Sequence, residues 1–141
     1  MYLKSPDETH ILVVEDDKEI QELYGYYLEE IGYRVDVAKD GEEAIEKCKC
    51  NQYDLAIIDY RLPGVNGNVV AAELSENNPG THILFITGSY DLVHHLSSQN
   101  SKYYVLLKPV KVDEIIKTIK KVLVDPEDKF HQPLEEYTVV E

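Results

Sequence analysis

Polar side chains follow four short apolar runs of the sequence, at the point where each run ends. These side chains are Glu15, Asp16, Asp59, Thr87 and Lys108. A carboxylate that faces a divalent cation, a lysine and a hydroxyl can attack a phosphoryl donor and form an acyl phosphate. Carboxylates that lie close together repel one another unless a cation is present, and all-oxygen ligands suit Mg²⁺ rather than Zn²⁺. The residue types therefore indicate phosphoryl transfer to an aspartate, if the fold brings them together.

Short apolar runs alternate with longer amphipathic segments, which is typical of an α/β fold with a parallel sheet. The apolar runs predict strands at 11–14, 33–37, 55–58, 83–86 and 103–107. The amphipathic segments predict helices at about 20–31, 41–50, 69–77, 91–98 and 113–123. Asp17 and Asp40 are expected to cap two of these helices at their N-termini, and Gly32 to end one.

Five such units predict a (βα)5 flavodoxin-like fold, a doubly wound parallel sheet with strand order 2-1-3-4-5. In open parallel sheets, ligands bind beyond the carboxyl ends of the strands, at the point where the strand order reverses. Strands one and three are neighbours there. Glu15, Asp16 and Asp59 should therefore meet at one edge of the sheet.

The chain has 141 residues, which is a usual size for one domain, and a formal net charge of −13. We expect an N-terminal extension at 1–9, one domain at 10–124, and an acidic tail or linker at 125–141, in which 134–140 could form a short strand. The acidity argues against contact with nucleic acid or an anionic membrane surface. No apolar run is long enough to cross a bilayer and no secretory signal is visible, so we expect a cytoplasmic protein.

The ordered set of motifs resembles a response-regulator receiver domain of two-component signal transduction, over about His10 to Val124. The motifs are Ile11–Asp17, Asp59–Gly67, Thr87-Gly88 and Lys108-Pro109. The resemblance implies a signalling phosphoprotein that catalyses only its own phosphorylation and dephosphorylation. It implies a histidine kinase or a phosphotransfer protein as phosphoryl donor. Output would pass through protein contacts, by a monomer or a phosphorylation-dependent homodimer.

The resemblance also assigns a role to each site residue. Asp59 would be the phospho-acceptor, with Thr87 and Lys108 contacting the phosphoryl group. The Mg²⁺ ligands would be Glu15, Asp16, Asp59 and the backbone carbonyl of Arg61. The remaining positions of the phosphoryl pocket and its switch would be Gly88, Tyr104, Val105 and Pro109.

The chain departs from the family pattern in the strand before Lys108. The family usually has an aromatic residue three positions before the lysine, coupled to the threonine, and here Val105 occupies that position. Tyr104 comes one residue earlier, and strand alternation sends it to the opposite face unless a slip or bulge shifts the register. The segment 89–102 also lacks the usual turn, so we expect a fourth helix that is short or mobile.

Two other interpretations stay open. Aspartyl-phosphate phosphatases also carry an aspartate after a strand, but they generally need a second aspartate two residues later, where this chain has Arg61. A receiver-like interaction module that is not phosphorylated usually lacks an acidic residue or the lysine, and this chain keeps both. Cys48 and Cys50 do not have Cys-x-x-Cys spacing, and a helix would point them to different faces.

Overall fold

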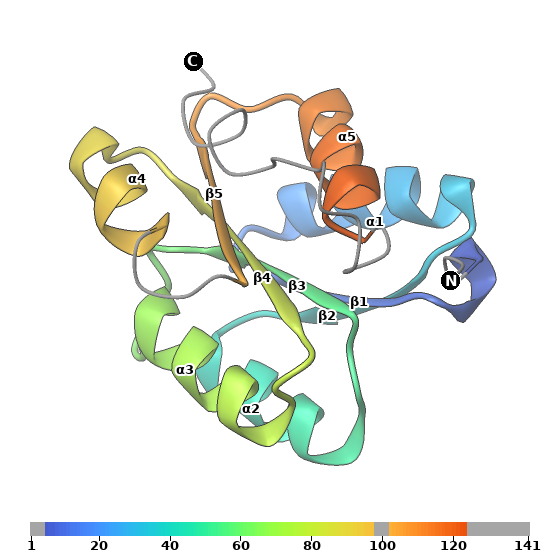
Figure 1. Ribbon diagram of the computed structural model, residues 1–141, viewed down its shortest axis with the longest axis horizontal. Helices are drawn as coiled ribbons and strands as arrows, with labels where there is room; N and C mark the ends of the chain where they lie inside the picture. Colours follow the sequence, from blue (N-terminus) through green and yellow to red (C-terminus); the bar gives the residue numbers. More distant parts are fainter. Residues whose placement is uncertain (1–4, 98–101, 124–141) are drawn as a thin grey trace.

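A central sheet lies between two layers of helices in the computed structural model, which describes residues 5–97 and 102–123 (Figure 1). The strands are β1 His10–Val14, β2 Arg34–Ala38, β3 Leu55–Asp59, β4 His82–Thr87 and β5 Tyr103–Leu107. The helices are α1 Lys18–Ile31, α2 Gly41–Cys50, α3 Gly67–Asn77, α4 Tyr90–Ser97 and α5 Val112–Val122, and a 3₁₀ turn, η1, covers Pro6–Glu8. The predicted alternation of strands and helices is confirmed.

All neighbouring strands are parallel, and their order is β2-β1-β3-β4-β5, as predicted. The three inner strands are buried on both faces, which explains their continuous apolar sequence. β2 and β5 form the two edges. The carboxyl ends of β1 and β3 lie side by side, so the residues after them share one edge of the sheet.

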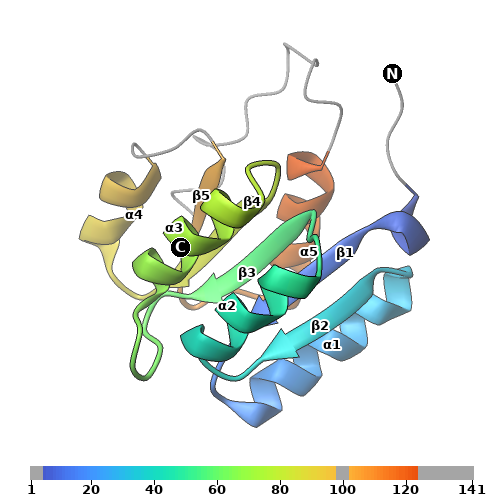
Figure 2. The same cartoon turned by 90° about the horizontal axis from the view of Figure 1, so that it is seen from below.

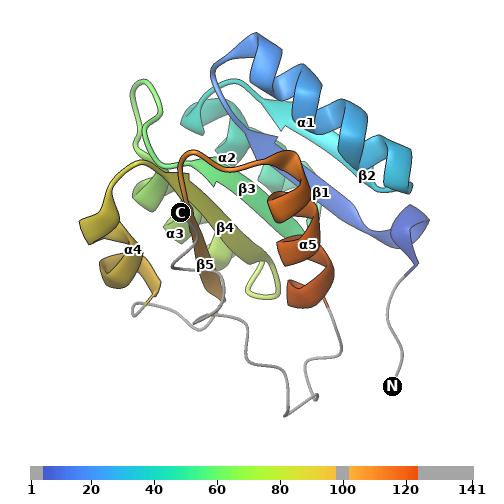
Figure 3. The same cartoon turned by 90° about the horizontal axis from the view of Figure 1, so that it is seen from above.

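Helices α1 and α5 cover one face of the sheet, and α2 and α3 cover the other (Figures 1, 2 and 3). Alternate strand residues enter the two cores: Val13 and Ile57 pack with α1 and α5, whereas Val14 and Ile58 pack with α2 and α3. The short helix α4 lies beside β5, and its Leu92 packs against the same core as α2 and α3. None of the described helices is long and apolar enough to span a membrane.

Side-chain caps fix where the helices begin. Asp17 Oδ1 accepts hydrogen bonds from the N–H groups of Glu19 and Ile20 at the start of α1, at 2.9 and 3.3 Å. Asp40 caps α2 in the same way through the N–H of Glu43, at 2.8 Å. Gly32 ends α1 in the left-handed region, with φ 114°. All three predicted ends are confirmed.

Exposure differs from the periodic pattern on two helices. Leu23 and Tyr27 fit the apolar spacing of α1, yet each is 44% exposed, and Val69 on α3 is 48% exposed. The buried residues of α1 are Tyr24 and Leu28, because the contact between α1 and the sheet is narrower than the apolar stripe of the helix. Cys48 is buried and Cys50 exposed, as the helical spacing predicts. The predicted tail at 125–141, with its possible strand at 134–140, lies outside the described residues.

Candidate functional site

Three carboxylates meet where β1 and β3 end. One oxygen from each of Glu15, Asp16 and Asp59 lies within 4.8 Å of the others. Glu15 and Asp59 are only 5% and 8% exposed, while Asp16 faces solvent. Hard cations such as Mg²⁺ favour oxygen ligands of this kind. The prediction that these side chains lie together is confirmed, and their role as metal ligands stays a prediction.

Glu15 is held in an environment that opposes its charge. Burial, with Asp59 and Asp16 nearby, raises the pKa of Glu15 to about 7, although the Asp17 N–H and Lys108 act in the opposite direction. The Asp17 N–H donates to Glu15 Oε2 at 3.1 Å. A cation among the three carboxylates would relieve this repulsion and favour the charged form. The surroundings of Glu15 therefore fit a metal site.

The loop that carries Glu15 has a support that the sequence interpretation missed. The side-chain amide of Gln21, on α1, donates to the backbone carbonyl of Glu15. This bond ties the first turns of α1 to the end of β1. A glutamine in an amphipathic helical segment gives no sequence signal for such a role.

Two donors converge on one oxygen of Asp59. Lys108 Nζ lies 3.3 Å from Asp59 Oδ1 and crosses from the end of β5, where its side chain is 44% exposed. The backbone N–H of Arg61 donates to the same oxygen at 3.3 Å. The site is therefore reachable from solvent on the Lys108 side. Asp59 Oδ1 is thus held by a cation and a backbone amide.

The ends of β3, β4 and β5 are tied to one another by backbone hydrogen bonds. Tyr60 N–H donates to the carbonyl of Ile86 at 3.0 Å, and Lys108 N–H donates to that of Thr87 at 2.7 Å. Thr87 is 1% exposed, and its hydroxyl oxygen accepts from the Ser89 N–H at 3.1 Å. A Cβ on Gly88 would meet nothing within 4 Å, so there is open space beside Thr87.

Gly67 brings the start of α3 close to Asp59. A Cβ at this position would lie 3.0 to 3.2 Å from backbone atoms of Tyr60 and Asp59. The glycine therefore allows α3 to begin directly beside the end of β3, where Asn66 caps it. Arg61 and Pro109 lie at the solvent side of the same edge.

The register of β5 decides on which face of the sheet Tyr104 lies, and it agrees with the alternation expected from the sequence. β5 pairs with β4 without a bulge, with Tyr104 opposite Leu84 and Val105 opposite Phe85. Tyr104 is buried on the α1 and α5 side, with its ring 5.7 Å from that of His82. Val105 is fully buried on the other side, the face to which Thr87 belongs by strand alternation. Tyr104 therefore does not reach Thr87, because the slip that would bring it there is absent.

Comparison with known families gives a match over most of the chain. Residues 11–120 match the model of the response regulator receiver domain. The chain is 34% identical over 118 residues to the response regulator ArlR of Staphylococcus saprophyticus, covering 82% of this chain and 52% of that protein. It is 35% identical over 113 residues to the transcriptional regulatory protein DltR of Streptococcus agalactiae, covering 78% and 50%. The chain thus spans about half the length of the curated relatives it matches.

Solved structures of response regulators are similar to this chain as well. The response regulator protein TrrA from Thermotoga maritima, in complex with Mg²⁺-BeF, superposes with a TM-score of 0.72 at 37% identity, over 82% of this chain and 99% of that chain. A CheY-like response regulator receiver domain protein from Methanospirillum hungatei superposes with a TM-score of 0.74 at 28% identity, over 82% and 93%.

Proposed function

The chain belongs to the response regulator receiver domain family, a signalling module of two-component systems, and we propose that it accepts a phosphoryl group on Asp59 with Mg²⁺ bound. The observation that carries the proposal is the position of the Asp59 carboxylate, between two other carboxylates and the Lys108 ammonium. The complete set of acidic residues and the lysine favours phosphorylation over a receiver-like module that is not phosphorylated.

Mg²⁺ would be held by Glu15, Asp16, Asp59 and the backbone carbonyl of Arg61. The raised pKa of Glu15, caused first by its burial, supports this donor set because a cation there removes the repulsion. When bound, Mg²⁺ would supply charge stabilisation for the oxygens of the transferring group. Structural relatives support the choice of metal, since TrrA is described in complex with Mg²⁺-BeF.

The residues of the chain itself divide the remaining work. A carboxylate oxygen of Asp59 attacks phosphorus and forms the new P–O bond, while the bond from phosphorus to the donor breaks and its electron pair leaves with the donor. Lys108 Nζ lies 3.3 Å from Asp59 Oδ1. It would contact an oxygen of the phosphoryl group and stabilise the negative charge on that oxygen. Water then attacks phosphorus, the bond between phosphorus and the Asp59 oxygen breaks, and inorganic phosphate leaves while Asp59 returns to a carboxylate.

Thr87 and Gly88 would complete the phosphoryl pocket. The space beside Gly88 can take the phosphoryl oxygens, and the Thr87 hydroxyl can donate to one of them after rotating. Arg61, exposed beside the acceptor, would meet the incoming donor or water. The support for these roles is that Thr87, Gly88 and Arg61 lie at or just after the ends of β3 and β4, at the same edge of the sheet as Asp59.

The phosphoryl donor would be a histidine kinase or a phosphotransfer protein, and the chain would act in the cytoplasm and catalyse only its own phosphorylation and dephosphorylation. DltR is named a transcriptional regulatory protein, and the match to this chain covers half of DltR. The prediction that residues 1–141 do not contact nucleic acid rests on their net charge of −13 alone. The signal would pass on through protein contacts, made by a monomer or by a phosphorylation-dependent homodimer.

The test is phosphorylation by acetyl phosphate with and without Mg²⁺, read by intact mass. We expect a gain of one phosphoryl group that needs Mg²⁺ and is absent in Asp59→Asn. A failure of the wild-type chain to gain mass, together with no response to beryllofluoride, would favour the module that is not phosphorylated. A gain that persists in Asp59→Asn would assign the acceptor to another residue.

A further inference from the structure

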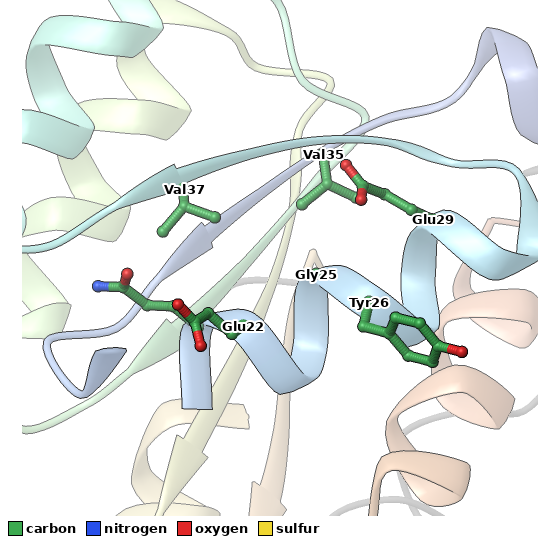
Figure 4. A pocket seen from close by; sticks show the side chains of 7 residues that line it. Glu22, Gly25, Tyr26, Glu29, Val35 and Val37 are labelled. Carbon is green, nitrogen blue, oxygen red and sulfur yellow. The ribbon is translucent and has the colours of Figure 1, made fainter. Parts of the chain in front are cut away.

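A hollow of about 370 Å³ lies between α1 and the edge strand β2. It is lined by Gln21, Glu22, Gly25, Tyr26, Glu29, Val35 and Val37, and we call it the α1–β2 hollow. Figure 4 shows Val35 and Val37 pointing from β2 toward α1. Both valines are only partly buried, and Tyr26 is 59% exposed. The floor of the hollow is therefore apolar surface in contact with water.

Gly25 is the residue that leaves this space open. It lies in the middle of α1, where glycine destabilises a helix by ~1 kcal/mol relative to alanine. Nothing in the fold requires a glycine there, because a Cβ would meet nothing within 4 Å and φ is not positive. Packing thus does not explain Gly25, whereas an occupant that approaches the helix backbone over Val35 and Val37 does.

Two carboxylates stand at the rim of the hollow. Glu22 and Glu29 are two turns apart on α1, about 10 Å along the helix axis, with Gly25 between them. Both are exposed, and neither forms an ion pair with another described residue. The rim therefore favours positive charge on both sides of the apolar floor.

We propose that the α1–β2 hollow docks a basic segment of a partner protein, with one apolar side chain over Gly25 and lysine or arginine residues on either side. The apolar side chain would cover Val35 and Val37, and the flanking cations would pair with Glu22 and Glu29. The net charge of −13 favours a basic occupant over a second copy of this acidic chain. Asp59 does not line the hollow, but Gln21 does, and its side-chain amide donates to the backbone carbonyl of Glu15 in the acidic cluster.

A helical peptide with two lysines two turns apart and a leucine between them is the probe. We would titrate it into the isotope-labelled full chain and follow amide shifts by NMR. We expect shifts centred on Gly25, Tyr26, Val35 and Val37. Gly25→Leu fills the hollow and should weaken binding about tenfold. Peptides with serine for leucine, or glutamate for lysine, should lose binding.

Glu29→Lys and Glu30→Lys form a matched pair, because both reverse one exposed charge on α1 and only Glu29 lines the hollow. Glu29→Lys should weaken binding about tenfold and Glu30→Lys should have little effect. Equal loss in both variants, or binding that Gly25→Leu leaves unchanged, would mean non-specific attraction and overturn the proposal. The proposal is also overturned if the peptide does not bind or if the shifts are centred elsewhere. Shifts at the hollow that depend on protein concentration alone would indicate a second copy of the chain and would overturn it too.

Discussion

Lys108 is the residue that, in the proposed reaction, would contact the phosphoryl group as it reaches Asp59. Its Nζ reaches Asp59 Oδ1 across the space between β3 and β5, at 3.3 Å, although the two residues are 49 positions apart. We predict that Lys108→Met slows phosphorylation by acetyl phosphate about 10²-fold, the usual effect of removing one donor to a developing charge. The rate of mass gain at fixed Mg²⁺ measures this.

The control is Lys111→Met, which removes an exposed lysine three positions further along the chain. It should leave the rate unchanged. An equal rate in wild type and Lys108→Met would show that Lys108 does not contact the transferring group.

His82 is a buried histidine at the start of β4 whose charged form the fold disfavours. Burial, with the positive charge of Lys102 as a smaller cause, lowers the pKa of His82 from 6.5 to about 4. Its Nδ1 has no hydrogen-bond partner among the described residues. The unfolded chain therefore binds a proton below pH 6.5 while the folded chain does not, so stability is present above 6.5 and falls as the pH drops toward 4.

We predict that this histidine accounts for a loss of ~3 kcal/mol of unfolding free energy between pH 7 and pH 4. Urea unfolding of wild type and His82→Leu across that range is the measurement. The variant should lose less stability on acidification, because leucine binds no proton in either state. Parallel curves for the two proteins would contradict the low pKa of His82.

At the scale of elements, the regular register of β5 decides which of its side chains lies on the same face of the sheet as Thr87. Thr87 and Val105 belong to one face of the sheet and Tyr104 to the other. We predict that Thr87→Val slows phosphorylation by acetyl phosphate at least about tenfold, since a donor to the phosphoryl group is lost, and that Tyr104→Phe leaves the rate unchanged. A strong effect of Tyr104→Phe would mean that its hydroxyl acts at the site after all.

Two glycines on helices should respond oppositely to alanine. Gly25→Ala should stabilise the chain by ~0.5–1 kcal/mol, because the new Cβ meets nothing and the helix gains propensity. Gly41→Ala should destabilise it by ~1–3 kcal/mol, because its Cβ would lie 2.6 Å from Val70 Cγ2 and 3.0 Å from the Val65 carbonyl oxygen. Urea unfolding at one pH measures both. Stabilisation by Gly41→Ala would show that α3 can move away from α2.

The sequence alone predicts the strands that are buried on both faces. The runs at β1, β3 and β4 predict inner strands because both of their faces are covered. Their ends predict the meeting of Glu15, Asp16 and Asp59, since parallel strands carry their carboxyl ends to one edge. Asp17, Asp40 and Gly32 act within one turn of chain, so local chemistry predicts them too.

Features that depend on contacts between distant elements escaped prediction. Periodicity gives Leu23 and Tyr27 the same apolar character as Tyr24, and only the position of α1 over the sheet decides which is buried. The bond from Gln21 to the Glu15 carbonyl and the space over Gly25 likewise depend on how α1 packs against its neighbours. The face of Tyr104 was predicted by alternation, whereas the absence of a bulge required the structure.

At the scale of the whole molecule, a net charge of −13 makes any cation stabilising to some degree, so a specific Mg²⁺ site has to be separated from general screening. Binding to the folded state alone adds about 1.4 kcal/mol of unfolding free energy when free Mg²⁺ is ten times its Kd. We predict this increment for wild type in MgCl₂ over NaCl of the same ionic strength, measured by urea unfolding.

Asp16→Asn is the variant that separates the two effects, because it removes one carboxylate from the cluster and changes the net charge by a single unit. In this variant NaCl should stabilise the fold as it does in wild type, since screening acts on all the remaining charges, while the additional effect of MgCl₂ should largely disappear. An increment that survives Asp16→Asn, or equal stabilisation of wild type by the two salts, would place the response to Mg²⁺ in the overall negative field and not at the ends of β1 and β3.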